Sequence, residues 1–130
     1  MALNKKTKAK IGAGAIILIF SITLFISSQQ SVEIIYFTNP NCILANNTDK
    51  IIQEIREKFG DKVSIREIKV NMYENDPPDT EEIKQLREKY KVYGVPEIII
   101  NGKEFTKQFT KYELEKAVCD QFIINPSVCL

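Results

Sequence analysis

The feature that most constrains this chain is a long stretch without charge near its start. Residues 11–26 (IGAGAIILIFSITLFI) are uncharged, and the next charged residue is Glu33. A helix of this stretch is about 24 Å long at ~1.5 Å per residue, and the neutral residues 27–31 extend it toward the ~30 Å of a hydrocarbon core. The stretch has no polar face, so it does not suit a core helix of a small domain. We therefore expect residues 32–130 to form the folded domain.

The residues before this stretch predict its orientation. Residues 1–10 hold four lysines and no acidic residue, and such a segment stays on the cytoplasmic side of a membrane. We predict a cytoplasmic basic segment at 1–10, a single transmembrane anchor or uncleaved signal with a short linker at 11–31, and an extracytoplasmic domain at 32–130. Membrane contact is expected through residues 11–27. The alternative is a cleaved secretory signal, for which residues 27–29 (SSQ) are a poor cleavage site.

Composition narrows the chemistry that the domain can perform. A chain of 130 residues is long enough for one core. Its net charge is +1, but without the four N-terminal lysines 14 basic residues face 17 acidic ones. This balance does not indicate a nucleic-acid surface. The absence of histidine excludes Ser-His and Cys-His catalysis and His-ligated metal sites. We predict no metal and no cofactor.

The spacing of apolar residues predicts alternating strands and helices. Strands are expected at 32–37, 63–70, 97–100 and 104–109, and helices at 42–59, 79–91 and 110–122. If the first helix is a crossover connection, the first two strands are parallel. The predicted fold class is therefore α/β, with the order β-α-β-α-β-β-α and a four-stranded mixed sheet flanked by helices.

Local signals mark the ends of these elements. The Asn-Gly pair at 101–102 separates the last two strands and readily takes the positive φ angles of a type I′ hairpin turn. Asp79 with Glu82, and Thr110 with Glu113, have the spacing of capping boxes. These pairs predict where the second and third helices begin.

Three motifs then occur in an informative order. FTNPNC at 37–42 follows the first strand, Gly-Val-Pro at 94–96 precedes the hairpin, and a helix follows the hairpin. Together they resemble the thioredoxin-like superfamily over residues 32–124, and the F-x-x-P-x-C pattern is similar to its glutaredoxin-like branch. The resemblance implies a thioredoxin-like fold in which the Val95-Pro96 bond is cis and lies against Cys42. It also implies that the backbone before Pro96 pairs with an extended substrate segment.

Cys42 is the candidate catalytic residue. It is expected in the first turn of a helix, where unpaired backbone N–H groups favour the thiolate, which is the attacking species. Pro40 stiffens the approach to the helix, and Asn41 can cap it. The polar neighbour Asn41 favours a solvent-facing sulfur; the alternative is a small buried hydrophobe, the commonest fate of a free cysteine. The resemblance implies that Pro40, Val95 and Pro96 contact the substrate.

Ala45 departs from the family's pattern. It stands where a C-x-x-C motif has the second cysteine, which resolves a mixed disulfide. Tyr36 stands where thioredoxins proper carry a buried acid, and the Cys-Gly-Phe-Ser sequence of cluster-binding monothiol glutaredoxins is absent. Two functions stay open: thiol-disulfide exchange through Cys42, as an oxidoreductase or isomerase, and a redox-inactive peptide-binding or adaptor module. The expected partners are protein thiols or disulfides and an extended peptide at Pro96.

The two other cysteines lie near the C-terminus. In the family's layout, Cys119 is about 13 Å along the last helix at ~1.5 Å per residue, whereas a disulfide needs Cα atoms about 4.4–6.8 Å apart. Pairing of Cys119 with Cys42 is therefore not expected. A structural disulfide between Cys119 and Cys129 is predicted instead, because residues 125–126 (Asn-Pro) turn the tail back and the exterior is oxidising. Its loop of about 11 residues would stabilise by ~2.8 kcal/mol in the chain-entropy model.

Overall fold

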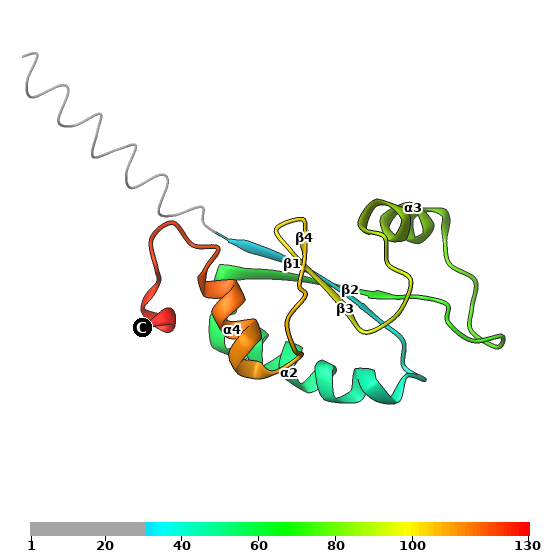
Figure 1. Ribbon diagram of the computed structural model, residues 1–130, viewed down its shortest axis with the longest axis horizontal. Helices are drawn as coiled ribbons and strands as arrows, with labels where there is room; N and C mark the ends of the chain where they lie inside the picture. The colour runs from blue at the N-terminus through cyan, green and yellow to red at the C-terminus, as the bar shows by residue number, and fades with distance from the viewer. Residues whose placement is uncertain (1–30) are drawn as a thin grey trace, which may run out of the picture. The chain divides into compact units, whose positions relative to one another are not determined.

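The computed structural model of the chain describes residues 31–130 (Figure 1). The predicted basic segment at 1–10 and the predicted anchor at 11–27 lie outside the described residues. Within residues 31–130, no helix combines the length and the apolar character that a membrane span requires.

Strands and helices of the described residues follow one another in the predicted order. The strands are β1 (Val32–Thr38), β2 (Val63–Lys69), β3 (Glu97–Ile100) and β4 (Lys103–Glu104), and the α-helices are α2 (Ile43–Phe59), α3 (Glu81–Tyr90) and α4 (Lys111–Cys119). The short 3₁₀ helices are η1 (Gly60–Lys62) and η2 (Ser127–Cys129). The order β-α-β-α-β-β-α that apolar spacing predicts is confirmed.

The strands form one mixed sheet in the order β2-β1-β3-β4. β1 pairs in parallel with β2, so α2 is the crossover between them. β1 pairs antiparallel with β3, and β3 pairs antiparallel with β4. Phe37 near the end of β1 lies opposite Glu97 at the start of β3. This register brings the segments that carry Cys42 and Pro96 to the same end of the sheet.

β1 is buried on both faces because helices cover both sides of the sheet. Figure 1 shows α2 and α4 on one side and α3 on the other. On the first side, Val32, Ile34 and Tyr36 belong to a cluster with residues of α2 and α4. On the second side, Ile35 and Phe37 belong to a cluster that α3 covers. A strand buried on both faces needs apolar residues at almost every position, which accounts for the apolar run at residues 34–37 of β1.

α3 begins later than predicted. Its N-cap is Thr80, whose hydroxyl accepts a hydrogen bond from the first turn of the helix. The predicted capping box of Asp79 with Glu82 is therefore wrong. The Asp79 carboxylate instead accepts hydrogen bonds from the Asn71 amide and the Arg87 guanidinium. A charged donor makes a stronger hydrogen bond than a helix amide does, so these tertiary partners determine where Asp79 lies.

The predicted hairpin turn is confirmed, but its second strand is shorter than predicted. Asn101 and Gly102 have φ angles of 46° and 79°, as a type I′ turn requires. β4 covers Lys103–Glu104 rather than residues 104–109. The Phe105 amide still donates a hydrogen bond to β3, after which the chain leaves the sheet. β4 is an edge strand and pairs only with β3. Its pairing therefore ends where the buried Phe105 side chain directs the chain toward α4.

α4 begins as predicted and ends early. The Thr110 hydroxyl accepts a hydrogen bond from the Glu113 amide over 3.3 Å at its N-terminus. The helix ends at Cys119 rather than at residue 122. Cys119 forms a disulfide with Cys129, with the two Cα atoms 5.7 Å apart. The disulfide ties the C-terminal tail to the end of α4.

Candidate functional site

Cys42 lies between the end of β1 and the start of α2. Its amide donates a hydrogen bond to the Asn39 carbonyl over 3.0 Å, which closes a β-turn with Pro40 at the position where a fixed φ suits such a turn. Cys42 is the N-cap of α2, and the first turn of this helix holds no acidic residue. The prediction placed Cys42 inside the first turn with Asn41 as the cap. The helix instead begins one residue later, and no side chain caps it.

The sulfur of Cys42 faces the segment before Pro96. Its Sγ atom lies 3.7 Å from the backbone oxygen of Val95, and the Val95–Pro96 peptide bond is cis. Cys42 is only 9% exposed, so the expectation of a solvent-facing sulfur is wrong. The polar neighbour Asn41 does not turn the thiol outward, because the loop that carries Val95 lies over it. The thiol is nevertheless outside both apolar clusters of the sheet.

A buried asparagine holds the cysteine turn to the rest of the fold. Asn39 is 1% exposed, and its side-chain nitrogen donates to the Val70 carbonyl over 2.8 Å and to the Asp76 carboxylate over 2.7 Å. Its side-chain oxygen accepts the Asn41 amide over 2.7 Å. An unpaired amide would be costly at this depth. Asn39 therefore fixes the position of the turn that presents Cys42.

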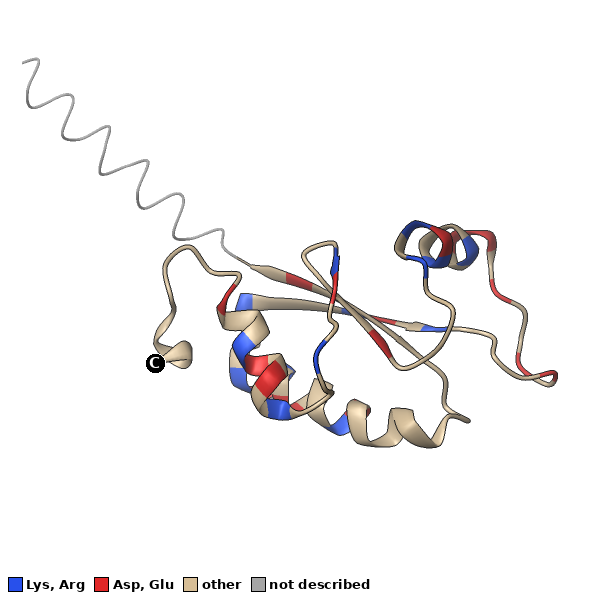
Figure 2. Cartoon of the chain, in the orientation of Figure 1, with Lys and Arg blue, Asp and Glu red and all other residues tan. Residues whose placement is uncertain are grey.

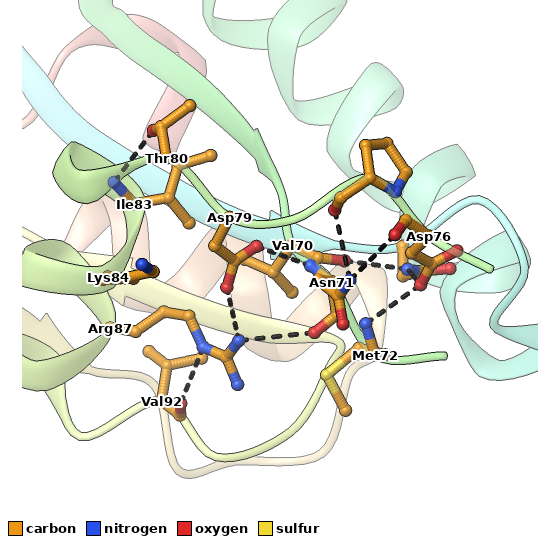
Figure 3. A network of polar contacts seen from close by, with 12 residues as sticks. Val70, Asn71, Met72, Asp76, Asp79, Thr80, Ile83, Lys84, Arg87 and Val92 are labelled. Carbon is orange, nitrogen blue, oxygen red and sulfur yellow. Dashed lines mark hydrogen bonds and ion pairs between the residues drawn. The ribbon is translucent and has the colours of Figure 1, made fainter. Parts of the chain in front are cut away.

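The Asp76 carboxylate gathers donors from two loops, and Figure 3 shows it beside Met72. One oxygen accepts the Asn41 side chain over 3.0 Å. The other accepts the Asn39 side chain and the amides of Met72 and Tyr73, each amide over 2.9 Å. These hydrogen bonds, that of the Met72 amide foremost, hold the pKa of Asp76 below its ordinary value because they favour the charged form. Asp76 thus joins the cysteine turn to the β2–α3 loop.

A second polar network joins the β2–α3 loop to the segment before Pro96 (Figure 3). Asp79 accepts the Asn71 amide over 2.6 Å and forms an ion pair with Arg87 at 2.6 Å. Arg87 also donates to the carbonyls of Asn71 and Val92, each over 3.3 Å. Because this ion pair is mostly buried, loss of either partner would leave an unpaired charge. The network therefore holds the chain that leads from α3 to Pro96.

Tyr36 and Ala45 occupy the two positions at which the chain departs from the thioredoxin pattern. Tyr36 is buried, and its hydroxyl donates to the Asp49 carboxylate over 2.6 Å. Burial, followed by this hydrogen bond, raises the pKa of Tyr36 far above its ordinary range, so Tyr36 stays protonated at neutral pH. Ala45 is buried one turn after Cys42, and its amide donates to the Cys42 carbonyl over 3.1 Å. No acid or second thiol therefore occupies either position.

Large exposed apolar side chains directly follow Cys42 and also occur in the two loops that the polar networks hold. Ile43 and Leu44 directly follow Cys42 and are 85% and 71% exposed. Tyr73 and Tyr93, in the loops that the two polar networks hold, are 48% and 83% exposed. Figure 2 shows no charged residue on the cysteine turn or the first turn of α2. Large apolar side chains that face water are candidates for an interaction surface. We call these four residues (Ile43, Leu44, Tyr73 and Tyr93) the apolar rim.

The structure brings the four predicted site residues together and adds others. Pro40 is exposed on the turn before Cys42, and Val95 and Pro96 are half-buried on the facing loop. Sequence reasoning missed the residues of the two polar networks: Asn39, Asn71, Asp76, Asp79 and Arg87. The prolines and aspartates of NDPPD indicated only a loop, because nothing local shows which distant asparagine a carboxylate meets. Residues 31–130 contain no cluster of Cys, Asp or Glu side chains that could hold a metal ion.

Comparison with known proteins supports the fold of the described residues. No protein-family model matches the sequence, and no curated protein sequence matches it either. The crystal structure of the germline-specific thioredoxin Deadhead from Drosophila melanogaster is similar with a TM-score of 0.51 and 12% identity, over 77% of this chain and 90% of that chain. A cysteine-to-alanine mutant of tryparedoxin-I has a TM-score of 0.51 and 17% identity, over 78% of this chain and 85% of that one. These likenesses establish an α/β, thioredoxin-like fold.

Proposed function

We propose that this chain is a membrane-anchored, extracytoplasmic thioredoxin-like protein of a prokaryotic cell that performs thiol-disulfide exchange through Cys42. The observation that carries the proposal is the 3.7 Å distance between Cys42 Sγ and the Val95 oxygen, next to Pro96. A peptide that pairs with the backbone of this loop would lie directly beside the sulfur. The site therefore combines a nucleophile with a place to hold an extended substrate.

The proposed reaction is a single exchange of disulfide partners. The Cys42 thiol gives its proton to a base in solution, and the thiolate attacks one sulfur of a partner disulfide. A bond forms between Cys42 and that sulfur while the partner's own disulfide breaks, and its second sulfur leaves as a thiolate. One disulfide forms and one is lost, so this step needs no further oxidant. Because Ala45 has no sulfur, a second thiol from outside must release Cys42.

The two polar networks support this role because they position both sides of the site. Asp76 holds the turn that carries Cys42, and Arg87 holds the segment that leads to Pro96 through the Val92 carbonyl. Cys42 and Pro96 are 54 positions apart in a chain of 130 residues, and neither segment is held by local structure alone. We therefore assign Asp76 and Arg87 as positioning residues rather than as catalytic ones.

The apolar rim indicates the class of substrate. Ile43 and Leu44 directly follow Cys42, Tyr93 lies three positions before Pro96, and all three side chains are strongly exposed. Burial of such side chains favours an apolar partner by about 25 cal/mol per Å². We propose that the partner presents its cysteine in an extended segment flanked by apolar residues.

The alternative function is a redox-inactive module that binds extended peptides as an adaptor. Two observations favour it: Ala45 removes the resolving thiol, and Cys42 is only 9% exposed. In this case the backbone before Pro96 and the apolar rim would hold a peptide, and the sulfur would be a packing residue.

Trapping of mixed disulfides distinguishes the two functions. The full chain and its Cys42→Ser variant are expressed at equal levels, cells are quenched with a thiol-blocking reagent, and attached proteins are released by a reductant. Exchange predicts covalent partners on the unmodified chain and none on Cys42→Ser. The adaptor function predicts the same non-covalent partners on both proteins. That second result would overturn the proposed exchange.

A further inference from the structure

We propose that the end of the domain opposite Cys42 rests on the lipid bilayer, with Ile123, Ile124 and Leu130 inserted at the level of the headgroups. This inference depends on the proposed membrane anchor. It concerns a second set of exposed apolar side chains, distinct from the apolar rim. We propose that a lipid bilayer covers them.

Hydrogen bonds place the C-terminal segment next to the start of the domain. The Glu33 amide near the beginning of β1 donates to the Asn101 side chain over 2.9 Å, and the Asn101 amide donates back to the Glu33 carbonyl over 2.8 Å. The Asn101 side chain also donates to the Gln121 side chain over 3.3 Å. The start of β1, the β3–β4 turn and the segment after α4 therefore lie together, and Figure 1 shows the C-terminus at this end of the described residues.

The segment that follows Gln121 presents large apolar side chains to solvent. Ile123, Ile124 and Leu130 are 84%, 57% and 99% exposed. Residues 121–130 (QFIINPSVCL) contain no charged side chain, and Figure 2 shows the tail without charge. An uncharged surface segment with exposed aliphatic side chains is suited to the boundary between headgroups and acyl chains.

The tail is held in place, so these side chains point outward from a fixed backbone. The disulfide between Cys119 and Cys129 ties its end to α4. Phe122 is buried in the core cluster that α2 and α4 form, and Val128 packs against that cluster. Two apolar residues of the tail are thus buried while their neighbours are exposed. A tail that was merely loose would not divide its apolar residues in this way.

The length of the preceding chain indicates what covers this surface. The predominantly apolar stretch ends at residue 26, and β1 begins at Val32. The intervening residues 27–31 span at most about 18 Å even when fully extended. If the stretch at 11–26 spans the membrane, this linker keeps the start of β1 close to the lipid surface. The side chains that lie next to the start of β1 then face the lipid.

Tryptophan fluorescence can test the inference in the full chain. The chain contains no tryptophan, so one introduced residue reports on one position. Ile123→Trp places the reporter in the tail, and Tyr93→Trp is a matched control at the Cys42 end, because the two replaced residues are 84% and 83% exposed. Both variants are reconstituted into phosphatidylcholine vesicles with and without bromine atoms on the acyl chains.

We expect brominated lipid to quench about half of the Ile123→Trp fluorescence and to leave Tyr93→Trp unchanged. Leu130→Trp is a second reporter and should be quenched like Ile123→Trp. Equal signals in both kinds of vesicle for the two tail reporters would overturn the inference, provided that the chains float with the vesicles. Failure to float would contradict the anchor itself, and the inference would fall with it.

Discussion

The sulfur of Cys42 lies 3.7 Å from the backbone oxygen of Val95, a residue 53 positions later in the chain. In this arrangement the neutral thiol donates to the carbonyl. Ionisation of the thiol removes this hydrogen bond. In the proposed function, the Val95 carbonyl also accepts an amide of an extended partner, for which its second lone pair is available. The predictions below concern this pair of residues, the loops around it and the C-terminal disulfide.

The first prediction concerns the missing second thiol. We expect Ala45→Cys to release a mixed disulfide formed at Cys42, because a thiol one helical turn from Cys42 can attack that bond within the same chain. In a quench-and-gel assay, release of a model mixed disulfide should be at least about tenfold faster than in the unmodified chain. Ala45→Ser, which has nearly the same size and no thiol, is the control. Equal release from both variants would contradict the role that we give to this position.

The second prediction concerns the Asp76 carboxylate. Asp76→Asn replaces one carboxylate oxygen by an amide nitrogen, which is a donor. The oxygen that remains cannot accept all the hydrogen bonds that the asparagine side chains and the loop amides donate to Asp76. We expect the cysteine turn to open more often, so that Cys42 is alkylated about fivefold to tenfold faster and the Cys42 amide exchanges hydrogen faster. Glu74→Gln alters an exposed carboxylate of the same loop and should change neither rate. Unchanged alkylation in Asp76→Asn would show that the network does not position Cys42.

The same carboxylate predicts an acid dependence of stability. The folded-state pKa of Asp76 lies below its ordinary value because of the hydrogen bonds that it accepts, that of the Met72 amide first. Its stabilising contribution is therefore fully present above the unfolded-state pKa of about 3.9 and is lost as pH falls through the lower folded-state value. Urea unfolding between neutral and acidic pH should show a smaller loss of stability in Asp76→Asn than in the unmodified chain over this range.

The third prediction concerns Glu97, directly after Pro96. Burial, followed by the charge of Glu104, raises the pKa of Glu97. Its charged form therefore opposes folding above the folded-state pKa, and the penalty disappears as pH falls below the unfolded-state value of about 4.3. We expect Glu97→Gln to unfold at higher urea concentration than the unmodified chain at neutral pH and at the same concentration near pH 4. Glu88→Gln, on the exposed face of α3, should show no such pH-dependent gain.

The fourth prediction concerns the disulfide of the tail. Replacement of both Cys119 and Cys129 by serine should lower the free energy of unfolding by about 2.8 kcal/mol, since the unfolded chain regains the entropy of an open loop of about 11 residues. Urea denaturation measures this change. The alkylation rate of Cys42 should stay the same, because the tail adjoins the opposite end of β1. A large change in Cys42 reactivity would argue against independent ends of the domain.

The fifth prediction concerns the apolar rim. Tyr93→Ser should weaken binding of an apolar cysteine-containing peptide by about tenfold, because it removes a large part of the apolar surface that the peptide would bury. Tyr112→Ser is the control: this tyrosine is also exposed but lines a cavity with Leu130 at the tail. Fluorescence anisotropy of a labelled peptide measures both. If the two variants bind equally, the rim does not select the substrate.

Local patterns in the sequence were sufficient to predict most of the fold. The Asn-Gly turn and the Thr110 cap have their causes within a few residues, and the structure confirms both. Asp79 shows where local reasoning fails. Its spacing from Glu82 fits a capping box, but Arg87, two turns into α3, forms an ion pair with it, and Thr80 caps α3 instead.

In the candidate site, too, some features have local causes in the sequence and others depend on tertiary contacts. Cys42, Val95 and Pro96 could be predicted as site residues from the sequence, because each belongs to a short motif of consecutive residues. The depth of the sulfur could not, because the loop that covers Cys42 comes from more than fifty residues away. The Asp76 network was also invisible, since its donors come from two loops that meet only after the sheet has formed.

The sequence by itself determined the periods of the helices and strands, the turn between β3 and β4, and the identity of the single unpaired cysteine. Those features follow from local stereochemistry and from the burial of apolar side chains. The tertiary structure alone decided that the thiol is covered, that a carboxylate holds its turn, and which large apolar residues stay exposed at either end of the domain. These are consequences of parallel and antiparallel pairing around β1, which brings together segments that no short-range rule can associate.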